Sequence, residues 1–177
     1  EPAGNLVKRN KVEKNGLLVT AYDPNPGKEF LASTDERFRP VNFCTGPDGA
    51  LYILDMYRGL IEHGPYVTPY LREQTLSRKL ELPVHMGRIW RVTPKNWKPI
   101  KIIFSNDWVD LLYHQNAWFR DIAQKKIVES GDASFIPKIK SKIEADSFSL
   151  GRLHALWSLH GLKHIDTTLL IRFITAN

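Results

Sequence analysis

The chain has 177 residues, 42% hydrophobic and 25% charged, a composition typical of globular proteins. The formal net charge of +6 is spread along the chain without a block of like charge, which argues against a nucleic-acid-binding surface. No apolar run approaches the roughly 20 residues that a membrane-spanning helix needs. A single cysteine, Cys44, excludes an internal disulfide and any Cys-x-x-Cys motif, and its apolar surroundings predict a buried, inert thiol.

Residues 1–95 have the composition of β-strands separated by turns. The predicted strands cover residues 17–22, 29–32, 41–45, 50–54 and 87–92. Asn15-Gly16 predicts a hairpin turn before the first of these strands. Between two later strands, Pro47 presets φ, Asp48 can accept from its own backbone, and Gly49 supplies a positive φ.

Residues 55–86 are too long for an ordinary connection between strands. They contain Pro65, Pro69 and Pro83, and residues 71–80 could form a short helix. Long excursions from a β-scaffold are commonly caps or binding loops, so we expect this insert to cover a site.

Residues 100–177 have helical periodicity, and we expect helices over 107–113, 117–129, 134–144, 149–162 and 166–175. Asn106 or Asp107, Ser134 and Asp166 lie where N-caps would lie. Trp118 and Trp157 are predicted to be core residues.

The second and fourth of these helices are similar at an offset of 32 residues. Ala123 then matches Ala155, and Ile127 matches Leu159. A period of this size, with one helix pair per unit, indicates an α-solenoid, in which further repeats should follow to cover the last apolar face. An isolated sheet of a few strands is also marginal, so we expect the chain to be an internal piece of a larger protein.

Charged and aromatic residues gather where the 41–45 strand starts and the 50–54 strand ends. Arg39 could clamp a carboxylate or oxyanion, or it could form an ion pair with an acidic neighbour. Asp55 could hold a cation or cap a turn, and Tyr57 and Arg58 could line a pocket or pack under the insert. His63 is a candidate base, with a surface residue as the alternative. We take Arg39, Asp55, Tyr57 and Arg58 as candidate cofactor contacts.

The remaining histidines do not predict a metal site. His85 also lies in the insert and, like His63, is a candidate base with a surface residue as the alternative. His160 and His164 could share a helix face, but no adjacent glutamate and no third ligand accompany them.

Three segments resemble the planctomycete-type membrane-bound dehydrogenase family: Glu29–Val41, Gly46–His63 and Gly87–Val92. Members of that family are similar to glucose/sorbosone dehydrogenases, six-bladed β-propellers that use pyrroloquinoline quinone (PQQ) with calcium. The segment Asn116–Leu162 is similar to the HEAT-like repeats that follow the propeller in many members, before a c-type cytochrome (haem) domain.

The resemblance implies a fold of β and α parts in separate segments. Residues 1–99 would be the C-terminal blade or blades of a six-bladed propeller, and residues 100–177 HEAT-like repeats. It implies a fragment of an exported, periplasmic or cell-envelope oxidoreductase that oxidises a sugar or other alcohol and passes electrons to a haem domain or cytochrome outside this chain. Of the candidate residues, Arg39 matches the arginine that precedes the inner strand in the family. The resemblance extends the site assignment, in second place, to Asp55 and Tyr57. The alternatives are a non-enzymatic scaffold that binds glycan or protein, and a hydrolase-like propeller with a metal at Asp55.

Overall fold

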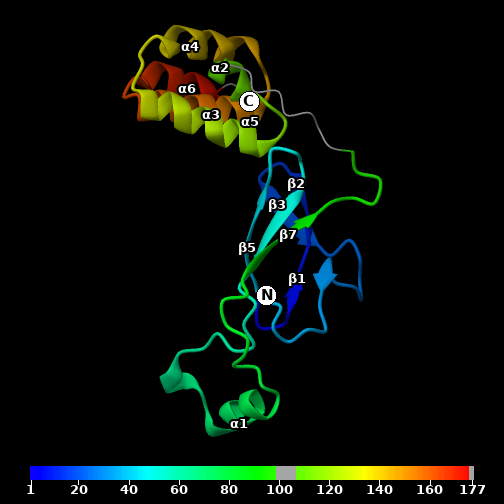
Figure 1. The fold of residues 1–177 in the computed structure, drawn as a ribbon. Coiled ribbons are helices and arrows are strands. Elements are labelled where there is room, and N and C mark those ends of the chain that lie inside the picture. Colours follow the sequence, from blue (N-terminus) through cyan, green and yellow to red (C-terminus); the bar gives the residue numbers. More distant parts are fainter. Residues whose placement is uncertain (99–106, 176–177) are drawn as a thin grey trace. The chain divides into compact units, whose positions relative to one another are not determined.

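The computed structural model describes residues 1–98 and 107–175 (Figure 1). By their internal contacts the residues form two compact units, 1–44 with 51–95 and 45–50 with 96–177. The predicted boundary at residue 99 lies outside the described residues, as does Asn106, the alternative N-cap. The first unit is built mainly from strands, and the second from helices.

The strands form small antiparallel sheets of two, two and three strands, ordered β1-β4, β2-β3 and β5-β6-β7. They are β1 (Leu6–Val7), β2 (Lys11–Asn15), β3 (Leu18–Tyr22), β4 (Leu31–Ala32), β5 (Pro40–Thr45), β6 (Leu51–Asp55) and β7 (Arg88–Val92). In the β2-β3 hairpin Asn15 pairs with Leu18, so Gly16 and Leu17 form the turn. Gly16 has a φ of 60°, as the first loop residue of a type II′ turn requires. The predicted hairpin is therefore confirmed.

The turn between β5 and β6 has the predicted chemistry. Gly49 has a φ of 79° and donates its N–H to the carbonyl of Gly46 at 3.0 Å. The Asp48 carboxylate accepts from the N–H of Ala50, also at 3.0 Å. Each residue of the Pro47-Asp48-Gly49 sequence thus suits the turn it occupies.

The β5-β6-β7 sheet exposes many of its apolar side chains. Ile53 of β6 is fully buried, whereas Phe43 of β5 is 62% exposed and Ile89 of β7 is 66% exposed. The prediction of a buried thiol was wrong, because Cys44 is exposed. An apolar strand buries its side chains only where a second layer packs on the sheet, and around Cys44 none of the described residues supplies one.

The insert between β6 and β7 comprises residues 56–87 and contains a 3₁₀ turn, η1 (Gly64–Tyr66), and a helix, α1 (Pro69–Ser77). Thr68 caps α1 by accepting from the N–H of Leu71 at 3.2 Å, with Pro69 in the first turn. The predicted helix over 71–80 therefore exists but begins earlier and ends earlier. Gly59 passes so close to Leu80 that a Cβ would lie 2.5 Å from the Leu80 carbonyl oxygen.

The helical unit agrees closely with the predicted boundaries. Its helices are α2 (Trp108–Leu111), α3 (Ala117–Ser130), α4 (Phe135–Ala145), α5 (Ser149–Gly161) and α6 (Thr167–Thr175). Asp107 caps α2, and the Asp166 carboxylate accepts from the N–H of Leu169 at 2.7 Å at the start of α6. Ser134 occupies the N-cap position of α4 without a side-chain cap bond. In the described residues no helix combines the length and apolarity that crossing a membrane takes.

The core of this unit lies between the helices. The fully buried pairs Ala123 with Ala155, and Ile127 with Leu159, occupy matching places on α3 and α5. Trp118 packs against this core, but Trp157 is 52% exposed, so its assignment as a core residue was wrong. The chain thus consists of small antiparallel sheets followed by a helical segment of four longer helices, α3 to α6.

Candidate functional site

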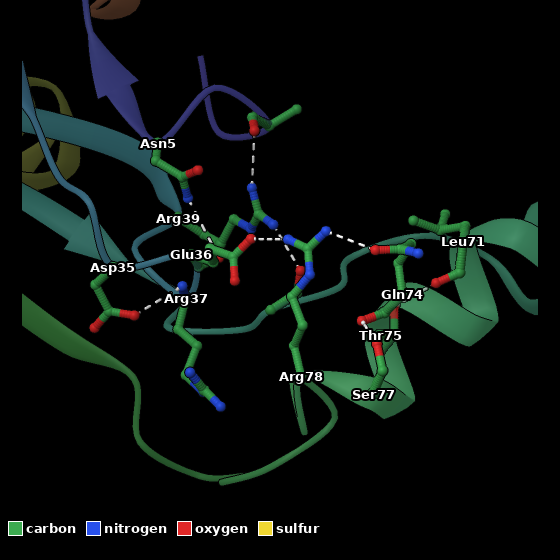
Figure 2. A network of polar contacts seen from close by, with 12 residues as sticks. Asn5, Asp35, Glu36, Arg37, Arg39, Leu71, Gln74, Thr75, Ser77 and Arg78 are labelled. Atoms are coloured by element: carbon green, nitrogen blue, oxygen red, sulfur yellow. Dashed lines mark hydrogen bonds and ion pairs between the residues drawn. The ribbon is translucent and has the colours of Figure 1, made fainter.

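Arg39, immediately before β5, uses its guanidinium to bind backbone carbonyls (Figure 2). Nε donates to the carbonyl of Arg58 at 2.8 Å, and Nη2 donates to that of Gly59 at 2.6 Å. Nη1 donates to the carbonyls of Pro2 and Ala3 at 2.8 and 3.0 Å. Four of the five guanidinium N–H groups are therefore engaged, and they join the N-terminal segment to the start of the insert.

The charge of Arg39 is partly desolvated. Burial lowers the pKa of Arg39, while the nearby Glu36 carboxylate acts in the opposite direction. Glu36 itself forms an ion pair with Arg78, whose Nη2 also donates to the side-chain oxygen of Gln74 at 2.7 Å. Neither the oxyanion clamp nor the simple ion pair describes Arg39, because its donors are directed at carbonyl groups.

Two further side chains extend this network. Arg37 donates from Nε to the carbonyl of Leu82 and from Nη2 to that of Lys79, both at 2.8 Å. Asn5 donates its amide to the carbonyl of Phe38 at 2.6 Å. We call Arg37, Arg39 and Arg78 the arginine brace, because together they bind both ends of the insert to the segment before β5.

Asp55, the last residue of β6, is only 3% exposed and accepts three hydrogen bonds. One carboxylate oxygen accepts from the backbone N–H groups of Arg39 and Tyr57, both at 2.8 Å. The other accepts from Nε1 of Trp90 at 2.9 Å. Both oxygens are thus occupied by N–H donors, so Asp55 fastens the strand ends and is poorly placed to hold a metal ion.

Tyr57 adopts a left-handed backbone conformation, with a φ of 47°. Its hydroxyl donates to Asp35 at 2.9 Å, and the Arg88 guanidinium lies 3.6 Å from its ring centroid. The pKa of Asp35 is lowered, chiefly by the N–H of Arg37 and further by the Tyr57 hydroxyl and by the charge of Arg88. Tyr57 therefore links the segment before β5 to β7.

The other candidates are not brought into this cluster. Arg58 contributes its backbone carbonyl to Arg39, and its own side chain is half-buried. His63 and His85 are exposed in the insert. The structure thus brings Arg39, Asp55 and Tyr57 together and leaves the proposed base, His63, outside.

A polar pocket of about 250 Å³ lies between α1 and the segment before β5. Its polar lining comes from Asn5, Glu36, Arg39, Gln74, Thr75 and Arg78. Figure 2 shows that the Arg78 side chain bridges Glu36 and Gln74 in this region. The pocket wall is therefore built from the same side chains that hold the insert in place.

Arg37, Arg39 and Asp55 do not fit PQQ or calcium as they stand. A quinone with several carboxylates needs free cationic donors, and those of Arg39 and Arg37 are committed to carbonyls. Across residues 1–98 and 107–175, no cluster of three or more His, Cys, Asp or Glu side chains could hold a metal ion.

Sequence reasoning missed Arg37, Arg78, Asn5 and Trp90 as partners in this network. A usable signal was the insert itself, because an irregular segment rich in proline leaves carbonyl groups that the protein must satisfy. Arginine residues near such a segment are natural donors for them.

The comparisons with known proteins supply a family but no activity. No curated protein and no solved structure matches the chain significantly. A family model described as a domain of unknown function (DUF7133) matches residues 1–96, more than half of the sequence. The chain therefore belongs to the family defined by this domain of unknown function, DUF7133.

Proposed function

We propose that this chain is the C-terminal part of a β-propeller followed by helical repeats, within a larger protein of the quinoprotein dehydrogenase type. The parent protein would be exported and would oxidise a sugar or another alcohol. The resemblance of Glu29–Val41, Gly46–His63 and Gly87–Val92 to membrane-bound dehydrogenases supports this proposal.

The exposed apolar side chains of the β5-β6-β7 sheet are the observation that carries the proposal. Phe43, Ile89 and Trp90 are large and exposed on a sheet of only three strands. Such a sheet is unfavourable in water, whereas a propeller blade has a neighbouring blade on each face. Packing in a larger β-structure would bury these side chains.

In this proposal the residues of the chain position a cap and do not perform chemistry. The start of β5 and the end of β6 lie at the same end of the sheet, where the Asp55 carboxylate accepts from the backbone N–H of Arg39. The insert begins at that end of the sheet, and the arginine brace binds both ends of the insert. The cap would cover one mouth of the propeller channel.

PQQ would supply the chemistry by accepting two electrons from the alcohol. Because the donors of Arg37 and Arg39 and the acceptors of Asp55 are already used, the ligands of the quinone and of calcium would lie on parts of the parent protein outside this chain. The electron-accepting c-type haem would lie there too.

The test uses the full-length parent loaded with PQQ and calcium. We expect it to reduce an artificial acceptor dye in the presence of at least one member of a panel of sugars and alcohols. Bound PQQ is measured separately by its absorption after extraction. A parent that retains PQQ but turns over no member of the panel, or one that binds no PQQ, would contradict the dehydrogenase proposal.

A second candidate is a non-enzymatic scaffold that binds glycan or protein. The use of Arg39, Asp55 and Tyr57 in structural contacts favours it, because these three side chains have little hydrogen-bonding capacity left for chemistry on a substrate. Binding of the full-length protein on a glycan array, with no PQQ uptake and no dye reduction, would support this candidate over the enzyme.

A further inference from the structure

Helix α5 repeats the position and register of α3. Ala117–Ser130 and Ser149–Gly161 begin 32 residues apart, and the buried residues Ala123 and Ile127 of α3 match Ala155 and Leu159 of α5. Because repeats in a solenoid pack on their neighbours in the same way, the face of α5 that matches the covered face of α3 should be covered by a helix too.

The contacts between α3 and α5 show which face of α3 is covered. Gln124 of α3 lies 2.8 Å from Nδ1 of His154, measured from its side-chain oxygen. Val128 contacts the other end of α5, where a Cβ on Gly161 would lie 2.6 Å from Cγ2 of Val128. Gly161 thus permits a close approach of the two helices that a larger residue would prevent.

The matching face of α5 is only partly covered by the described residues: Leu156 is half-buried and packs against the core, and His160 is exposed. Leu156 and His160 occupy the places of Gln124 and Val128, 32 residues later. They line a groove of about 320 Å³ together with Leu153, Trp157, Ile165 and Leu170. On this face Leu156 replaces Gln124 and His160 replaces Val128, while the neighbouring Leu153 and Trp157 of the groove are 48% and 52% exposed.

We propose that this groove is the seat for the first helix of a third unit of the same polypeptide, which packs on α5 as α5 packs on α3. The exposed apolar lining favours a helix of matching polarity. Its sequence is constrained by the register. The position 32 residues after His154 should be apolar, because it faces Leu156, and the position 32 residues after Gly161 should be small, because it faces His160. This inference rests on the repeat alone and does not depend on the dehydrogenase proposal.

The test is carbethoxylation of histidine with diethyl pyrocarbonate, read by mass spectrometry, in the 177-residue chain and in the full-length protein. His160 lines the groove, whereas His164 is exposed outside it and serves as an internal control. We expect the reactivity of His160 to fall several-fold in the full-length protein, with His164 unchanged. Leu156→Lys should restore the reactivity of His160 in the full-length protein. The matched variant Leu150→Lys, on the same helix but outside the groove, should not.

Equal reactivity of His160 in the two proteins would overturn the proposal. The proposal would also be overturned if His160 in the 177-residue chain became protected as the protein concentration rises and light scattering showed the mass of a dimer. The groove would then be occupied by a second copy of the chain. A full-length sequence with a polar residue opposite Leu156 and a bulky one opposite His160 would also contradict the register.

Discussion

Replacing Arg39 should loosen the insert without unfolding the whole strand unit. Arg39→Met removes four hydrogen bonds from a charged donor to the carbonyls of Pro2, Ala3, Arg58 and Gly59. Hydrogen bonds to charged groups contribute about 1.5–3 kcal/mol each, so four would contribute at least about 6 kcal/mol if fully buried. Because Arg39 is half-buried, water can replace part of these hydrogen bonds. We therefore expect the free energy of opening of the insert to fall by about 3 kcal/mol.

The assay is amide hydrogen exchange resolved to segments. A loss of about 3 kcal/mol corresponds to a roughly 100-fold rise in the opening equilibrium of residues 56–87. Amides of the β2-β3 hairpin serve as an internal reference, since none of their strand pairs involves Arg39. Arg39→Lys keeps the charge but offers one nitrogen, so its effect should be intermediate.

Arg72→Met is the matched control, because Arg72 is exposed on α1 and its removal changes the net charge equally. If Arg39→Met leaves exchange in the insert unchanged, the four carbonyl contacts do not hold the insert. If Arg72→Met has the same effect as Arg39→Met, the response comes from charge and not from these contacts.

Four other substitutions test separate parts of the molecule. Asp55→Asn should weaken the strand ends by about 2 kcal/mol, because an amide cannot accept all three N–H donors, and faster exchange in β6 and β7 with altered Trp90 fluorescence would show it. Gly151→Ala should lower the melting temperature of the helical unit in circular dichroism by an amount equivalent to about 1–3 kcal/mol, since its Cβ would lie 2.3 Å from the Tyr113 ring. Tyr113→Phe should be neutral or slightly stabilising in the same assay, because the buried Tyr113 hydroxyl has no hydrogen-bond partner among the described residues. Burial lowers the pKa of His154 below its usual value of 6.5, so the unfolded chain binds the proton more readily and the helical unit should lose stability as the pH falls below 6.5. Urea unfolding between pH 7 and 5 checks this slope, and His154→Gln should reduce it; an unchanged slope would place its origin elsewhere.

The secondary structure was largely predictable because its signals are local. The N-caps Asp107 and Asp166 and the turn residue Gly49 act on backbone groups within a few positions of themselves. The predicted start of α1 lies two residues too late, because proline suits the first turn of a helix and Pro69 occupies that turn.

Burial was less predictable because it depends on what packs against an element. Cys44 and Trp157 lie in apolar surroundings in the sequence and yet are exposed, each on an element whose outer face has no second layer in the described residues. An apolar pattern identifies a face that would be buried, but it does not say whether the burying partner belongs to the same stretch of chain.

The candidate site shows the same limit in its chemistry. Arg39, Asp55 and Tyr57 were predicted to lie together, and they do. Arg39 precedes β5 and Asp55 ends β6, and these two neighbouring strands have those termini at the same end of the sheet. The groups that these side chains bind could not be predicted, since most of them are backbone carbonyls and N–H groups, which every residue type has.

A group can serve a ligand only with the hydrogen-bonding capacity that its own fold leaves unused. Arg39 has one guanidinium N–H beyond the four that bind carbonyls, and both carboxylate oxygens of Asp55 already accept from N–H donors. A cofactor that recruited either residue would have to break contacts that hold the insert, and binding would then be coupled to opening of residues 56–87. The exchange experiment on Arg39 therefore also bears on function. If full-length protein loaded with PQQ shows faster exchange in the insert than the unloaded protein, these residues contact the cofactor; if exchange is unchanged or slower, the cofactor contacts lie on other parts of the protein.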